Sequence, residues 1–144
     1  MQVILNYPDV LDHAMRFWSK ESEVNLVVDA TYGTNIQNLT LINVSIVGLY
    51  EDTTNRIIRN GEIPVGQLLG TGAETKVQYY EIFNYVTRIV ARKLSELRKI
   101  SILEAMALTK GKVKFIFGDG NENGMEEAKK VFPERDYRRC LQHI

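Results

Sequence analysis

Two carboxylates occupy positions from which they could act together on a metal ion. Asp29 ends the short β-branched run that begins at Val24, and Asp119 follows closely on the apolar run Val113–Phe117. If the two runs are neighbouring parallel strands, both carboxylates leave the sheet at the edge where open α/β sheets gather their sites. Two carboxylates this close repel each other unless a cation lies between them, and oxygen ligands suit Mg²⁺ or Mn²⁺.

The pattern therefore predicts a metal site that activates water and stabilises a leaving oxygen in phosphodiester cleavage. An ordinary alternative stays open, because an aspartate at a strand end often caps a loop or the next helix.

The glycine-rich segment Gly118–Gly124 offers a second kind of chemistry. It lies between a predicted strand and a predicted helix, whose first N–H groups could bind a nucleotide phosphate. Its spacing is not G-x-G-x-x-G, however, and no lysine follows as in a P-loop. Asp119 and Glu122 would also repel a bare phosphate, and loop flexibility alone explains the glycines. We keep nucleotide binding only as a minor alternative.

The pair Cys140 and His143 forms C-x-x-H, half of a zinc-binding pattern. A structural zinc ion needs four ligands, but the chain has no other cysteine and one other histidine, His13, far away in the sequence. We therefore expect no zinc site in this chain alone. The plain alternative is a partly buried cysteine and a histidine that hydrogen-bonds locally.

The spacing of the apolar residues predicts the helices and strands that would position these groups. Spacings of three and four residues predict helices, and β-branched or alternating runs predict strands. Turn residues at Asp52–Asn55 and Asn60–Gly61 connect two of the strands, and Thr31–Asn35 is expected to be a loop. The predicted elements are a helix at about Val10–Ser19, strands at Val24–Asp29, Leu39–Tyr50 and Ile63–Leu69, helices at Glu74–Lys99 and Ile102–Leu108, a strand at Val113–Phe117 and a helix at about Asn123–Val131.

This order predicts an α/β fold with a mixed sheet. Three strands form an antiparallel meander, and a right-handed helical crossover then lays the fourth strand beside the first and parallel to it. The flanking helices cover the sheet. The chain of 144 residues is expected to be a single domain, since domains commonly have about 100–200 residues.

Composition narrows the function classes. Eighteen basic and 18 acidic side chains give no net charge, so charge alone does not indicate a nucleic-acid module. No apolar run is long enough for a membrane span, and the first residues do not form a signal peptide. We expect no membrane partner and no small-molecule cofactor.

Basic residues gather after residue 109, but acidic residues are interspersed among them. We interpret them as a solvated mixed-charge surface in preference to a dedicated DNA-binding patch. The aromatic residues of the long helix are interpreted as core and groove packing. The basic residues are Lys110, Lys112, Lys114, Lys129, Lys130, Arg135, Arg138 and Arg139, and the aromatic residues are Tyr79, Tyr80, Phe83 and Tyr85.

A composite motif fills the C-terminal part. It consists of Asp119 after a strand, a helix ending in Val131-Phe132-Pro133, and C-x-x-H, with twelve positions from Asp119 to Val131 and seven from Pro133 to Cys140. Earlier segments add Val27-Val28-Asp29-Ala30-Thr31-Tyr32, Ile63-Pro64-Val65-Gly66 and Ala73-Glu74-Thr75. Over about residues 24–144 these blocks resemble the Mutator-like (MULE) transposase domain.

The resemblance implies a ribonuclease H-like fold and the chemistry of a DDE/DDD transposase, which is metal-dependent cleavage and transfer of DNA strands. Asp29 and Asp119 match the first two catalytic acids of the family and would hold Mg²⁺ or Mn²⁺. Cys140 and His143 match its C-x-x-H, for which we expect a structural role. DNA as partner, homo-oligomer formation and a nuclear location are further expectations.

One departure from the family pattern limits these expectations. The family's third acid, usually a glutamate, lies well beyond C-x-x-H, whereas this sequence ends at Ile144. We therefore expect residues 1–144 to be a C-terminally truncated transposase core whose own enzymatic activity is open. The alternative function is a catalytically inactive, transposase-derived module that binds DNA or protein.

Overall fold

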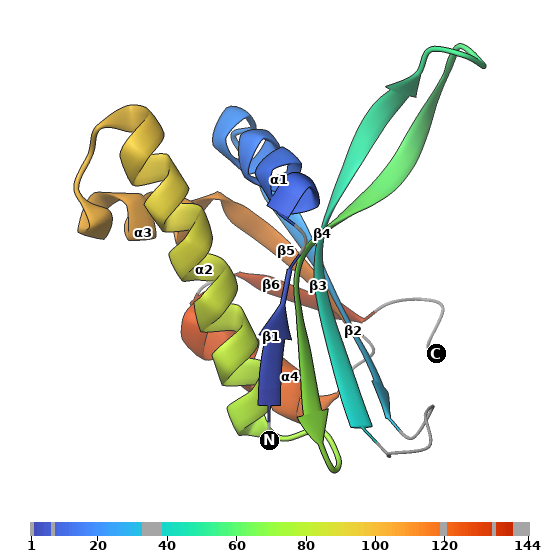
Figure 1. The fold of residues 1–144 in the computed structure, drawn as a ribbon, viewed down its shortest axis with the longest axis vertical. Helices are drawn as coiled ribbons and strands as arrows, with labels where there is room; N and C mark the ends of the chain where they lie inside the picture. The colour runs from blue at the N-terminus through green and yellow to red at the C-terminus, as the bar shows by residue number, and fades with distance from the viewer. Residues whose placement is uncertain (1, 7, 33–38, 119–120, 134, 140–144) are drawn as a thin grey trace.

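The computed structural model describes residues 2–6, 8–32, 39–118, 121–133 and 135–139 (Figure 1). Helices and strands alternate along most of the chain. In chain order they are β1 (Gln2–Leu5), α1 (Pro8–Lys20), β2 (Val24–Tyr32), β3 (Leu39–Asp52), β4 (Ile57–Thr71), α2 (Lys76–Arg98), α3 (Ile102–Lys112), β5 (Val113–Gly118), α4 (Glu122–Val131) and β6 (Asp136–Arg139). None of the helices in these ranges combines the length and the apolar character needed to cross a membrane.

The strands form one mixed sheet in the order β1-β4-β3-β2-β5-β6. Strands β2, β3 and β4 are an antiparallel meander. Strand β5 then pairs with β2 in parallel, β6 pairs with β5 in parallel, and β1 pairs with β4 antiparallel. The predicted α/β class, the meander and the parallel fourth strand beside the first are thereby confirmed.

The helices lie together on one face of the sheet (Figure 1). Side chains alternate between the two faces of a strand, and those facing the helices, such as Leu26, Ile42 and Ile46, are fully buried. The rings of Phe83 from α2 and Phe132 after α4 meet edge to face with centroids 6.0 Å apart. Residues on the other face of the central strands are mostly only half-buried.

Local capping sets the ends of the long helix. The Thr75 side chain accepts a hydrogen bond from the Gln78 N–H, and the Gln78 side chain accepts one from the Thr75 N–H, which together form a capping box. At the other end Lys99 adopts a left-handed conformation that ends the helix. Gly72, with a φ of 80°, makes the turn between β4 and α2 that a residue with a Cβ would adopt only with strain.

The packing of α1 requires a close approach to the sheet. A Cβ at Gly48 of β3 would lie 2.8 Å from the ring of Phe17, so only glycine leaves room for this ring. The C-terminal end of α1 then lies near the start of β2. Lys20, the last residue of α1, lines a cleft together with Arg98 of α2 and Lys112 of α3.

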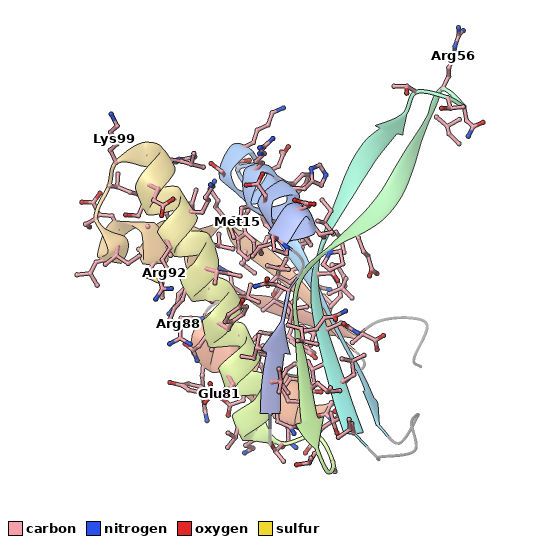
Figure 2. All side chains as sticks on the ribbon, in the orientation of Figure 1. Met15, Arg56, Glu81, Arg88, Arg92 and Lys99 are labelled. Atoms are coloured by element: carbon pink, nitrogen blue, oxygen red, sulfur yellow. The ribbon has the colours of Figure 1, made fainter. Side chains whose placement is uncertain are left out.

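Several boundaries differ from the prediction. Strands β1 and β6 were not predicted, because four residues at the rim of a sheet carry too little periodicity. Asn60–Gly61 is not a turn but part of β4, where Gly61 lies opposite Gly48. The hairpin turns at residues 53–56, which overlap the predicted turn at Asp52–Asn55, and Arg56 marks its tip, far from the helices (Figure 2). Helix α3 also continues past Leu108 to Lys112.

Candidate metal centre at the sheet edge

Asp29 lies inside β2 and not at its end, which corrects the sequence prediction. The strand continues to Tyr32 because β3 keeps pairing with it as far as Tyr32 opposite Thr40. Thr31 and Tyr32 are therefore strand residues, not loop residues. The parallel ladder with β5 ends earlier, at Val27 opposite Phe117, so Asp29 is placed beyond the last parallel pair.

Strand β5 ends at Gly118, the residue that precedes Asp119 in the sequence. The carboxyl ends of β2 and β5 are therefore at the same edge of the sheet, as predicted. Asp119 itself lies outside the described residues, and so do Cys140 and His143. The approach of the two aspartates and the role of C-x-x-H accordingly stay predictions.

Asn43 of β3 is the direct cross-strand neighbour of Asp29. Both side chains are half-buried and lie on the sheet face that the helices leave uncovered. The Oδ1 atom of Asn43 is buried and has no hydrogen-bond partner among the described residues. A buried oxygen without a donor destabilises a fold by about 1–3 kcal/mol, so this atom would favour an added donor or a cation.

The pair Asp29 and Asn43 fits a hard divalent cation in its chemistry. Cβ atoms directly across an antiparallel ladder lie about 4.5–5.5 Å apart, which allows one ion to contact both side chains. A carboxylate and an amide oxygen are ligands that Mg²⁺ and Mn²⁺ accept. Asn25 also has a buried, unpartnered Oδ1 in this part of the chain, but four residues along β2 separate it from Asp29 by about 13 Å.

Further ligands would have to come from elsewhere. Within the described ranges, no group of three or more histidine, cysteine, aspartate or glutamate side chains is arranged to hold a metal ion. Among the described residues, Asp29 and Asn43 are candidate oxygen ligands, and a metal site that joins Asp29 with Asp119 stays a prediction.

Glu74 is a further carboxylate at this edge, and no local sequence pattern marks it as a site residue. Its Oε2 accepts hydrogen bonds from the Tyr79 hydroxyl at 2.6 Å and from the Asn121 amide at 2.8 Å. Asn121 caps the start of α4 and comes two residues after Asp119 in the sequence. Glu74 thus ties the start of α4 to the start of α2. The only sequence signal for this carboxylate is its place in the Ala73-Glu74-Thr75 block.

The start of α4 bears on the predicted phosphate loop. The Asn121 side chain accepts a hydrogen bond from the Gly124 N–H at 3.2 Å, so a side chain already caps one of the donors that a phosphate would need. Glu122 in the first turn is exposed. Residues 119–120 lie outside the described part, and nucleotide binding by this loop stays a minor alternative.

The described basic side chains of the C-terminal region largely form the mixed-charge surface that the sequence suggests, and Lys112 is the clearest departure from it. Lys114 pairs with Glu23 at 3.3 Å, Lys130 with Glu127 at 3.1 Å, and Arg138 with Asp136 at 3.7 Å. Lys112 differs because only 7% of its surface is exposed. In the long helix Tyr79 and Phe83 are core residues, Tyr85 packs against the core, and Tyr80 is exposed.

Compared with models of known protein families the chain matches none, and no curated protein sequence matches it. The chemistry of this edge therefore rests on the chain's own residues and on their arrangement.

Proposed function

We propose that this chain is part of the catalytic core of a DNA transposase, in which a divalent metal at the sheet edge beside Asp29 serves DNA strand cleavage and transfer. The observation that supports the proposal most directly is the parallel pairing of β2 and β5. This pairing brings the strand that carries Asp29 next to the strand that Asp119 follows.

The fold expected from the MULE resemblance supports the same proposal. A ribonuclease H-like sheet contains a three-stranded antiparallel meander followed by a parallel strand next to the first. Strands β2, β3, β4 and β5 have this arrangement, with α2 and α3 in the crossover. We assign the chain to the ribonuclease H-like class as part of this proposal.

Asp29 and Asp119 would hold the Mg²⁺ or Mn²⁺ ion, and Asn43 would add a neutral oxygen ligand. When bound, the metal would activate the attacking water or hydroxyl and stabilise the departing oxygen of a DNA phosphodiester. Glu74 would act as a positioning residue, since it fixes the start of α4 through Asn121.

The proposal places cleavage and transfer in the intact protein. The family's third acid lies beyond the C-x-x-H motif and has no counterpart in residues 1–144. Because the chain carries no net charge, most of the DNA affinity is assigned to other parts of the parent protein. A nuclear location and assembly into homo-oligomers belong to the same proposal.

Calorimetric titration with Mn²⁺ and Mg²⁺ tests the metal assignment. The wild-type chain should bind the ion, and Asp29→Asn together with Asp119→Asn should abolish the binding heat. Asp136→Asn is the matched control, because Asp136 is an exposed carboxylate at the start of β6, opposite Phe115 and away from the carboxyl end of β5. Metal binding that survives the double substitution would remove both aspartates from the site.

A DNA- or protein-binding module without catalysis is the second candidate, and one surface favours it. The uncovered sheet face carries the half-buried rings of Phe115 and Phe117, whose centroids are 6.0 Å apart. The Arg138 guanidinium lies over the Phe115 ring at 5.4 Å. DNA binding that needs these rings and does not respond to Mn²⁺ would favour this second function.

A further inference from the structure

A basic cleft lies at the opposite end of β2 and β5 from Asp29. The C-terminal ends of α1, α2 and α3 converge there, just before β2 and β5 begin. The cleft has a volume of about 560 Å³, and its walls include Lys20, Arg98 and Lys112 and, among the described residues, the single acidic residue Glu21. It shares no residue with the candidate metal centre.

Two of these cations meet at one oxygen atom. The Lys112 ammonium donates hydrogen bonds to the carbonyl oxygens of Trp18 at 2.8 Å and Ser19 at 2.9 Å. The Arg98 guanidinium donates to the same Ser19 oxygen, also at 2.9 Å. The Lys112 Nζ and Arg98 Nη2 atoms therefore lie within twice 2.9 Å of each other.

The cleft holds more positive charge than its partners neutralise. The C-terminal carbonyl oxygens of α1, α2 and α3 add partial negative charge, which favours cations there and offsets part of the charge of Lys20, Arg98 and Lys112. Burial is the main cause that lowers the pKa of Lys112, and the nearby Arg98 lowers it further, while Glu21 acts in the opposite direction. An anion in the cleft would relieve this repulsion.

A second, smaller hollow of about 230 Å³ also borders Gly111 and Lys112. Arg135 lines it and donates from Nη2 to the Gly111 carbonyl at 3.3 Å. The Nε–H of Arg135 is buried and has no acceptor within the described ranges. Glu23 and Asp136 also line this hollow, which shares Gly111 and Lys112 with the basic cleft. A buried donor without an acceptor is rare, so an acceptor oxygen beside Gly111 would satisfy Arg135.

We propose that the basic cleft binds a phosphate group. Phosphate carries several acceptor oxygens and can contact a guanidinium fork and an ammonium at the same time, which suits the convergence of Arg98 and Lys112. Free phosphate and the phosphodiester backbone of a nucleic acid share this chemistry. The proposal is independent of the metal centre, because the two sites occupy opposite edges of the sheet.

The test compares inorganic phosphate, acetate and a DNA oligonucleotide by calorimetry at constant ionic strength. Arg98→Gln and Lys20→Gln should each weaken phosphate binding about tenfold, since each removes one charge from the cleft. Lys99→Gln is the matched control: it removes the same charge one residue from Arg98, at an exposed position whose side chain points away from the helix ends (Figure 2). Circular dichroism confirms that each variant is folded.

Phosphate binding that the cleft variants weaken and Lys99→Gln leaves unchanged supports the proposal. If phosphate also displaces the oligonucleotide, the site takes backbone phosphates; if only phosphate binds, it takes a small ligand. The proposal is overturned if phosphate and oligonucleotide both fail to bind, if Lys99→Gln weakens binding as much as Arg98→Gln, or if acetate binds as tightly as phosphate.

Discussion

The two ends of the β2–β5 pair have opposite chemistry. At the carboxyl end Asp29 and Asn43 present oxygen atoms from two strands of the sheet. At the amino end Lys112 and Arg98 present cations from the last turns of two helices. Strands hold the oxygen ligands and helix ends hold the cations, so one parallel strand pair separates a candidate cation site from a candidate anion site.

This difference also explains why the sequence predicts the residues at the acidic end but not those at the basic end. The acidic end follows from local patterns, because each aspartate comes at or just after an apolar run. The basic end depends on the convergence of three helix ends, which no local pattern encodes. Lys110, Lys112 and Lys114 alternate in the sequence as solvated residues do, yet Lys112 is buried.

The largest effect that we expect concerns this buried lysine. Lys112→Met should lower the free energy of unfolding by about 2 kcal/mol, because the Trp18 carbonyl loses its charged donor at the end of α1. Urea denaturation measures this loss. Lys114→Met is the control: its exposed pair with Glu23 should contribute less than about 1 kcal/mol. Equal losses in the two variants would contradict a special role for Lys112.

How far the sequence predicts the fold depends on how local each feature is. The central strands were predicted because buried apolar runs such as Val24–Val28 have a strong signal of their own. The sequence pattern predicts the end of β2 too early, because this end is set by continued pairing with β3, whose residues are distant in the sequence. The edge strands β1 and β6 were missed for the same reason, since only their partners make them strands.

The residues of the candidate site also divide into those with a local sequence signal and those without one. Asp29 was predicted from its place beside an apolar run. Asn43 has no signal of its own, because its importance comes from a register that puts it opposite Asp29. Glu74 likewise gains its role only when folding brings it to Asn121, 47 positions away.

The acidic end can be sharpened by adding a charge to it. Asn43→Asp should strengthen Mn²⁺ binding about tenfold, because a second carboxylate would face the ion beside Asp29. Without metal the same variant should lose up to about 1 kcal/mol of stability, since like charges directly opposite on a sheet repel. Calorimetry and urea denaturation with and without Mn²⁺ measure the two effects.

Asn43→Leu is the companion variant, which removes the oxygen ligand and adds no charge. If the Asn43→Asp variant neither binds the metal more tightly nor gains stability from Mn²⁺, this result would contradict a cation site at this edge.

The smallest expected effect is a pH dependence at the basic end. Burial and Arg98 lower the pKa of Lys112 below its ordinary value of 10.5, so the folded protein binds this proton more weakly than the unfolded chain. Between the lowered pKa and 10.5 the unfolded state holds more protons, and stability must therefore rise with pH in this window. Below the window both states are protonated, and Lys112 adds no pH dependence.

The difference in unfolding free energy between wild type and Lys112→Met should thus shift in favour of wild type from neutral to alkaline pH, whereas the difference between wild type and Lys114→Met should lack this contribution. A difference that shifts against wild type over the same range would mean that the Trp18 and Ser19 carbonyls outweigh burial and Arg98, and the amino end would then lack the excess positive charge that distinguishes it from the carboxyl end.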